Sequence, residues 1–200
     1  MSLTPLSSTA VQLIVIGASA GGVEAVGRIL GALPSRSPIA VAIVLHLPPD
    51  RPSTLASLFA SQCALPVKEA EDKEDIAPGT IYIAPPNYHL LVEPDQRFSL
   101  SVEEAILYSR PSIDLLFESA AYAYGDSLLA VVLTGASSDG AEGLALARRL
   151  GSTAWVQDPG DARARAMPQA AVDLAQPDRV IPLSTLVHDI AALMSLPTGP

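Results

Sequence analysis

Three polar residues of this 200-residue chain each follow an apolar run of strand length. Ser19 and His46 come directly after such runs, and Asp139 lies shortly after a third. A serine hydroxyl is a poor nucleophile until an imidazole accepts its proton, and the imidazole needs a carboxylate to hold its tautomer. The three residue types are therefore the parts of an acyl-transfer site, with a serine nucleophile, a histidine base and an orienting carboxylate.

Small residues surround Ser19 in the segment IGASAGG at 16–22. Such residues let the backbone turn sharply and leave room for a substrate above the hydroxyl. The backbone N–H groups of Ala20 and Gly21, at the expected start of a helix, are predicted to face a developing oxyanion. The second donor could equally come from the loop at 135–138.

The choice of histidine rests on elimination, because the chain has three. His188 falls on a closing helix and His89 in an inserted segment, so only His46 ends a core strand. Purely structural interpretations stay open at this point. Ser19 and Asp139 are both favoured helix N-caps, and a histidine at a strand end is more often a hydrogen-bonded core residue. Their joint placement after three strands favours the catalytic interpretation.

Apolar runs of strand length alternate with segments of helical spacing along most of the chain. Strands are predicted at 12–17, 39–45, 128–134 and 153–157, and helices at 21–33, from about 54, and at 112–124, 140–150, 168–174 and 183–193. This alternation predicts an α/β fold with a doubly wound, mainly parallel sheet and helices on both faces, a Rossmann-like three-layer domain. Short segments at 81–84, 89–93 and 97–102 predict a small antiparallel insertion. Ligands bind at the carboxyl ends of such strands, where the three candidates lie.

Composition narrows the possible partners. The net charge is −9 and no Lys/Arg run is present, so we expect this surface to repel nucleic acid and anionic membranes. No apolar stretch reaches the roughly 20 residues that span a bilayer, so we expect no membrane insertion and a cytoplasmic protein. We expect residues 1–10 to be disordered and residues 11–200 to form one catalytic domain.

The chain resembles the catalytic domain of chemotaxis-receptor methylesterases, the CheB-type family. Seven segments carry the resemblance in the family's order: IGASAGG (16–22), LHLP (45–48), IAPPNYHL (83–90), SRPSIDLLF (109–117), LTGASSDGA (133–141), QDP (157–159) and MP (167–168). The resemblance implies that Ser19 is the nucleophile, His46 the general base and acid, and Asp139 the orienting carboxylate. It implies hydrolysis of glutamate 5-methyl esters on the cytoplasmic helices of chemoreceptors, with glutamine deamidation as a related activity. No metal or organic cofactor is implied.

Two departures from the family pattern are visible. Members often have Met-Gly where this chain has Ala136-Ser137, in the loop that borders the expected site. Many members also carry an N-terminal receiver domain of roughly 120 residues. Here the first expected strand begins near residue 12, so we expect no receiver domain in this chain and any regulator to act in trans. Arg110, Arg163 and Arg165, expected near the strand ends, are candidates for contacting an acidic receptor.

Other functions fit part of the pattern. A strand, a glycine-rich turn and a helix also open dinucleotide-binding domains, but 16–22 gives no clean G-x-G-x-x-G, and His46 stands where a ribose-binding acid is expected. A non-catalytic relative that binds receptors through the same surface is the second alternative. An ordinary α/β-hydrolase is disfavoured by the chain order Ser, His, Asp.

Overall fold

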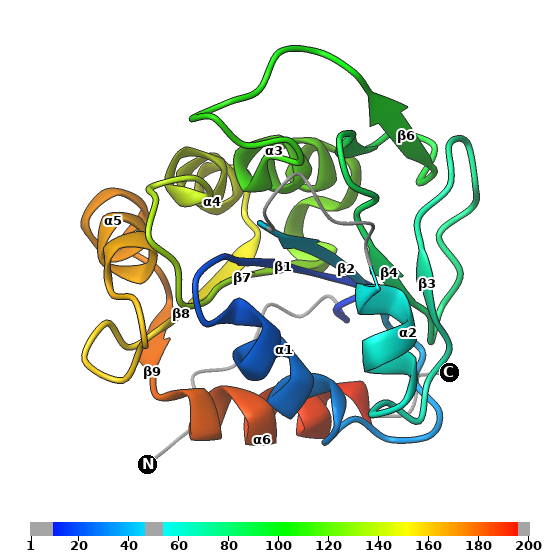
Figure 1. Cartoon of the computed structure of the whole chain (residues 1–200), viewed down its shortest axis with the longest axis horizontal. Helices are drawn as coiled ribbons and strands as arrows, with labels where there is room; N and C mark the ends of the chain where they lie inside the picture. Colours follow the sequence, from blue (N-terminus) through cyan, green and yellow to red (C-terminus); the bar gives the residue numbers. More distant parts are fainter. Residues whose placement is uncertain (1–9, 47–53, 196–200) are drawn as a thin grey trace.

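A computed structural model describes residues 10–46 and 54–195 of the chain (Figure 1). Its centre is a seven-stranded sheet in the order β3-β4-β2-β1-β7-β8-β9, in which every neighbouring pair is parallel. The strands are β1 (Leu13–Ala18), β2 (Ala40–Leu45), β3 (Val67–Glu69), β4 (Ile81–Ile83), β7 (Leu128–Val132), β8 (Thr153–Gln157) and β9 (Arg179–Ile181). A separate antiparallel pair is formed by β5 (His89–Val92) and β6 (Phe98–Ser101). The predicted fold class, a parallel α/β sheet with a small antiparallel insertion, is confirmed.

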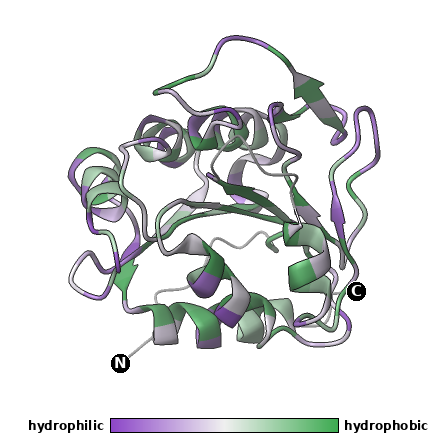
Figure 2. Cartoon of the chain, viewed as in Figure 1, coloured by the Kyte–Doolittle hydropathy of each residue, from purple (hydrophilic) through white to green (hydrophobic). Residues whose placement is uncertain are grey.

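Helices cover both faces of the sheet (Figure 1). One face carries α3 (Ile113–Tyr124), α4 (Ala141–Arg149) and α5 (Ala166–Ala175), and the other carries α1 (Gly22–Leu30), α2 (Leu55–Ala60) and α6 (Leu183–Met194). Along β1, Leu13 and Val15 pack on the first face, whereas Ile14 and Ile16 pack on the second. Because both faces are covered, the central strands are apolar throughout, as Figure 2 shows.

Three strands differ from the sequence prediction. Residues 81–83 were expected in the antiparallel insertion, but β4 pairs in parallel with β2 and β3 in the main sheet. All three residues of β4 are buried, and a strand this short has too few positions to show whether one face or both are covered. The strands β3 and β9, also of three residues each, were not predicted. The expectation that residues 1–10 are disordered falls almost wholly outside the described residues.

None of the helices within residues 10–46 and 54–195 is long and apolar enough to cross a membrane. The longest of them, α3 and α6, have 12 residues each. A membrane-spanning helix needs about 20.

Glycines allow α3 to pack unusually close to its neighbours. A methyl group at Gly17 on β1 would overlap the side chain of Ile113, the first residue of α3. A methyl group at Gly143 on α4 would lie 2.6 Å from the backbone oxygen of Asp114. These contacts bring the N-terminus of α3 to the carboxyl end of β1, the edge where ligands bind in such sheets.

Replacing Gly143 by alanine should destabilise the fold, although alanine normally stabilises a helix relative to glycine. The added methyl group meets backbone atoms of α3, which cannot move aside as a side chain can. We expect a loss of about 1–3 kcal/mol in the free energy of unfolding, measured by urea denaturation. The neighbouring exposed change Glu142→Ala is the control and should stay within about 0.5 kcal/mol. Equal stability of both variants would contradict the close packing of α3 and α4.

Candidate active site

The carboxylate of Asp139 is fully buried and accepts four hydrogen bonds. Its Oδ2 accepts from His46 Nε2 at 2.9 Å and from the Ile113 N–H at 2.7 Å. Its Oδ1 accepts from the Ser112 hydroxyl and the Asp114 N–H, both at 3.0 Å. Three of these donors belong to the N-terminus of α3, where free N–H groups and the helix dipole favour a negative charge.

These donors determine the protonation state of Asp139. Burial alone would raise the pKa of its carboxyl group, but the hydrogen bonds from His46, Ile113 and Asp114 lower the pKa below its usual value. Asp139 is therefore an ionised acceptor at neutral pH. An ionised carboxylate cannot donate, so the hydrogen bond to His46 requires a proton on the imidazole Nε2.

His46 follows β2, and its backbone N–H donates to the Ala18 oxygen at 3.1 Å. Its side chain is 12% exposed. With the Nε2 proton directed at Asp139, the neutral ring has its lone pair on Nδ1. The Ser109 hydroxyl lies 3.4 Å from this nitrogen and can donate to it. Nδ1 is therefore the atom of His46 that can accept a proton.

Ser19 leaves the strand next to that of His46, because Ala18 and Leu45 are paired residues of β1 and β2. Its N–H donates to the Thr134 oxygen at 3.0 Å, and its oxygen accepts from the Gly22 N–H at 2.7 Å, which closes a tight turn. Among the residues that the structure describes, none forms a hydrogen bond with the Ser19 hydroxyl. The structure thus joins His46 to Asp139 and places Ser19 at the adjacent strand end, while the catalytic roles of all three stay predictions.

The simpler interpretations of two candidates are wrong. The N-cap of α1 is Gly21, with φ 82°, and not Ser19. The N-cap of α4 is Gly140, with φ 97°, and not Asp139. The Asp139 carboxylate instead binds the N-terminus of α3, a helix that precedes it in the chain. Capping of the helix that follows in the chain therefore explains neither Ser19 nor Asp139.

The predicted oxyanion donors lie in the turn between β1 and α1. In the described part of the chain, no acceptor is bound by the N–H of Ala20 or of Gly21. The alternative loop at 135–138 has one donor fewer, because the Gly135 N–H already donates to the Ala164 oxygen at 3.0 Å. Donation by Ala20 and Gly21 to an oxyanion stays a prediction.

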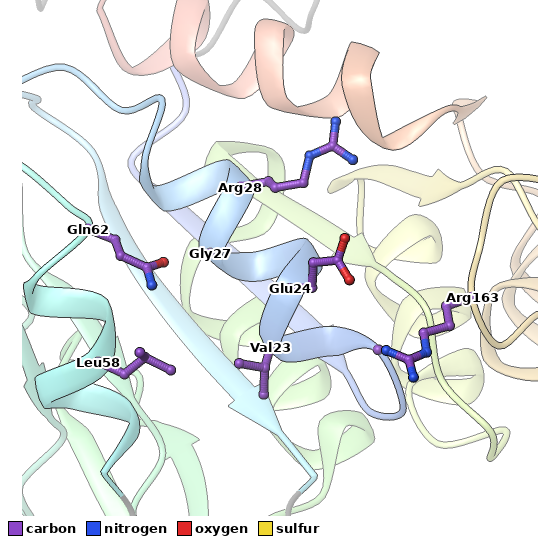
Figure 3. Close-up of a pocket in the computed structure, with 8 residues that line it drawn as sticks. Val23, Glu24, Gly27, Arg28, Leu58, Gln62 and Arg163 are labelled. Atoms are coloured by element: carbon purple, nitrogen blue, oxygen red, sulfur yellow. The ribbon is translucent and has the colours of Figure 1, made fainter.

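A groove of about 690 Å³ runs along the outer side of α1, starting at Gly21 (Figure 3). Val23 of α1 and Leu58 of α2 supply apolar walls, and Arg163 reaches across the N-terminal end of α1. The aliphatic part of the Arg163 side chain packs against Gly21. A Cβ atom added at Gly21 would lie 3.0 Å from the Arg163 Cβ and Cδ atoms. The groove therefore adjoins the turn that carries Ser19, although none of the three candidate catalytic side chains lines it.

The three candidate receptor-contacting arginines have different surroundings. Arg110 donates to the oxygens of Val102 and Glu103 at 2.8 and 2.9 Å, so it fixes its own loop. Arg165 is exposed at the start of α5. Arg163 forms no ion pair with any residue in the ranges 10–46 and 54–195. Arg165 is likewise in no ion pair within these ranges, and Arg163 is the one of the three that lines the groove beside the turn that carries Ser19.

Sequence reasoning missed two residues of α3. Asp114 mirrors Asp139, since its Oδ1 accepts from the N–H groups of Gly140 and Gly143 at 2.9 and 2.7 Å, at the start of α4. Ser112 is the N-cap of α3, yet its hydroxyl accepts no N–H of its own helix and instead donates to Asp139. In the sequence, Ser112 and Asp114 are recognisable as residue types that favour a helix N-terminus. The sequence does not indicate which groups their side chains bind.

His89, set aside from the sequence, lies fully buried beside this network. Its Nδ1 accepts from the Ser112 N–H at 3.1 Å, and its Nε2 contacts the Glu104 oxygen at 3.1 Å. The ring is thus a neutral imidazole that holds Ser112, which in turn donates to Asp139. No spacing in the sequence indicated this contact.

No group of three or more His, Cys, Asp or Glu side chains that could hold a metal ion occurs within the described ranges. His46 and the backbone N–H groups of Ile113 and Asp114 bind the Asp139 carboxylate. The chemistry that they support is proton transfer and anion stabilisation.

Comparison with known proteins gives consistent matches. The sequence profile of the family described as CheB methylesterase matches residues 14–190. A relative from Leptospira interrogans is 45% identical over 177 residues, which cover 88% of this chain and 92% of the relative. A Burkholderia lata protein named protein-glutamate methylesterase/protein-glutamine glutaminase 3 is 39% identical and covers 96% of this chain, which spans only 53% of that protein. The crystal structure of the Thermotoga maritima CheB methylesterase catalytic domain superposes with a TM-score of 0.86 at 31% identity, covering 92% of this chain and 100% of that one.

Asp114 should make the stability of the protein depend on pH. Burial and the nearby negative charge of Asp139 raise the pKa of Asp114 to about 7. Between about pH 4 and this value the folded state holds a proton that the unfolded chain has released, so the free energy of unfolding falls as the pH rises. Relative to Asp114→Asn, the wild type should lose up to about 1.4 kcal/mol per pH unit across this window.

Urea unfolding of both proteins at several pH values from 4 to 8 measures this difference. The exposed change Asp173→Asn on α5 serves as the control, since it removes one carboxylate without touching the buried pair. Parallel stability curves for the wild type and Asp114→Asn would refute the assigned protonation of Asp114.

Proposed function

The chain belongs to the CheB methylesterase family, and on that premise we propose that it hydrolyses glutamate 5-methyl esters on chemoreceptors with Ser19, His46 and Asp139. In this proposal, the Ser19 hydroxyl attacks the ester carbonyl while His46 Nδ1 accepts its proton. The negative oxygen that forms is stabilised by the N–H groups of Ala20 and Gly21. His46 then returns the proton to the departing methoxide, and methanol leaves a glutamyl ester on Ser19.

Water completes the reaction by the same route in reverse order. His46 Nδ1 takes a proton from water, the resulting hydroxide attacks the glutamyl ester, and the proton returns to the Ser19 oxygen. The products are a free serine and a glutamate carboxylate. Asp139 stays ionised throughout and stabilises the imidazolium, since its carboxylate has the four donors described above.

The hydrogen bond between His46 and Asp139 is the observation that carries this proposal. It joins a strand-end imidazole to a carboxylate that the protein keeps buried and ionised, and it leaves the opposite ring nitrogen available. Ser19 lies at the neighbouring strand end, and its hydroxyl forms no hydrogen bond with any of the described residues. Hydrogen bonds between nucleophile and base are often long in free enzymes and tighten when substrate binds.

The names of the relatives extend the proposal to a second leaving group. The Burkholderia lata protein is named as both a methylesterase and a glutaminase of protein side chains. Deamidation of glutamine needs the same nucleophile and base, with ammonia departing in place of methanol. We therefore propose glutamine deamidation as a secondary activity. Control by a regulator in trans stays a prediction.

Replacing Ser19 by alanine should abolish methanol release from methylated receptor. Loss of the nucleophile typically lowers kcat by several orders of magnitude, about 10⁶-fold where it has been measured in a serine protease. Ser109→Ala is the matched control, because Ser109 is the serine whose hydroxyl lies near His46 Nδ1 in this structure. We expect that variant to lose no more than about tenfold, the effect of one weak neutral hydrogen bond.

The pair of serine variants separates three outcomes. Loss of methanol release in Ser19→Ala alone supports Ser19 as the nucleophile. Loss of methanol release in Ser109→Ala alone would assign that role to Ser109. Full activity in both variants would point to a non-catalytic relative or to another site.

Arg163 should assist the binding of an acidic polypeptide substrate. The chain as a whole is negative, so a cation beside the site is needed to offset repulsion of carboxylates on the substrate. We expect Arg163→Glu to raise KM for methylated receptor by about tenfold at low salt, with a smaller effect at high salt because exposed charges are screened. Steady-state methanol release at several salt concentrations measures the change in KM and its dependence on salt.

The control for Arg163 is Arg36→Glu, which makes the same charge change ahead of β2, at the amino-terminal edge of the sheet. It should leave KM within about twofold, because charges beyond about 10 Å are largely screened at ordinary salt. Equal effects of the two variants would mean that overall charge matters and the position of Arg163 does not.

A further inference from the structure

A two-residue turn beside His46 has an unusual backbone. The N–H of Ile106 donates to the Ser109 oxygen at 3.1 Å, and the N–H of Ser109 donates to the Ile106 oxygen at 2.8 Å. The two residues between them, Leu107 and Tyr108, have φ angles of 48° and 63°. Two positive φ angles in a two-residue hairpin are the pattern of a type I′ turn, for which Asn-Gly is strongly preferred. We call residues 106–109 the Leu-Tyr turn.

The two side chains at the tip of the Leu-Tyr turn are not buried by the fold in return for this strained backbone. Leu107 is 50% exposed, and Tyr108 is fully exposed. Leucine and tyrosine are uncommon at positive φ, and their exposed apolar surface adds none of the stability that burial would give. Strained backbone that persists without local packing is more frequent at functional sites than elsewhere. The arrangement therefore calls for a role outside the folding of the chain.

The turn is held firmly against the site. Arg110 donates to two backbone oxygens at the start of the loop, at Val102 and Glu103, and the buried His89 contacts the oxygen of Glu104. At the other end, the Ser109 hydroxyl lies 3.4 Å from His46 Nδ1. The base of the loop is thus fixed, and Ser109, the last residue of the turn, lies beside the imidazole.

We propose that the Leu-Tyr turn is the docking element for the polypeptide that carries the ester, and that it binds an apolar side chain next to the modified glutamate. This inference rests on the function proposed above. Tyr108 directly precedes Ser109, whose hydroxyl lies 3.4 Å from His46 Nδ1, so a polypeptide that presents its ester to His46 would lie next to the turn. A small soluble ester lacks the neighbouring side chains that such a contact requires.

The chemistry of the turn selects the kind of contact. Its tip has no charge, and Glu103 and Glu104 precede it in the loop, so an acidic side chain of the substrate is disfavoured there. Exposed tyrosine and leucine contribute to binding by covering apolar surface, and tyrosine is enriched among the residues that dominate binding energy. Carboxylates of the same substrate would instead lie toward Arg163, which borders the turn after β1.

The decisive variant is the double change Leu107→Asn and Tyr108→Gly. Asparagine and glycine suit the positive φ angles, so the variant should fold and its melting temperature should rise. We expect kcat/KM for methylated receptor to fall at least tenfold, mostly through KM, while kcat/KM for a small glutamate methyl ester changes less than twofold. Methanol release with the two substrates measures both values.

A matched control removes exposed side chains of the same kinds elsewhere. Leu174 on α5 and Tyr122 on α3 are 47% and 70% exposed, and their double change to alanine should leave both substrates unaffected. Unchanged receptor processing in the turn variant would overturn the inference, as would an equal fall for both substrates. A wild type that forms a dimer lost in the turn variant, with receptor processing intact, would assign the turn to self-association instead. Absence of any esterase activity in the wild type would refute the proposed function itself, together with this inference.

Discussion

The buried carboxylate of Asp139 is the interaction on which the arrangement of the site depends. An ionised carboxylate removed from water is costly unless hydrogen bonds replace its hydration. Here the N-terminus of α3 and the imidazole of His46 supply those bonds, so one group fixes a helix, a strand end and a ring orientation together. The position of α3 consequently determines where Asp139 and His46 lie, although none of the α3 side chains is assigned a reacting role.

Packing and electrostatics are combined in the pair α3 and α4. Asp139, just before α4, binds the N–H groups of α3, and Asp114, in the first turn of α3, binds those of α4. These reciprocal hydrogen bonds require the N-termini of α3 and α4 to lie close together. The absence of a side chain at Gly143 permits this approach. Burial raises the pKa of Asp114, and repulsion from the nearby carboxylate of Asp139 raises it further. One of the pair is thereby kept ionised while the other is more easily protonated.

The fold and the candidate side chains were largely predictable, because buried parallel strands leave long apolar runs and the residues after them meet at one edge. Ser19 and His46 were found in this way. The short strand β4 was misplaced, since three residues carry too little pattern. The contacts of His89 and Ser109 could not be foreseen, because they join residues 15 to 63 positions apart through hydrogen bonds that no periodicity records. The family resemblance marked the segment 109–117 but assigned no partner within it.

The orientation of the His46 ring has a consequence for how such a site can be assembled. Nδ1 is bonded to the ring carbon that carries the side-chain stem, so it lies closer to the main chain than Nε2 does. Adjacent strands are only about 4.8 Å apart, and β1 and β2 are adjacent. An imidazole that works with its inner nitrogen suits a nucleophile on the very next strand, and its outer nitrogen is left to span the wider gap to a more distant acid. Strand spacing, and not loop length, would then dictate which end of the ring does the proton transfer.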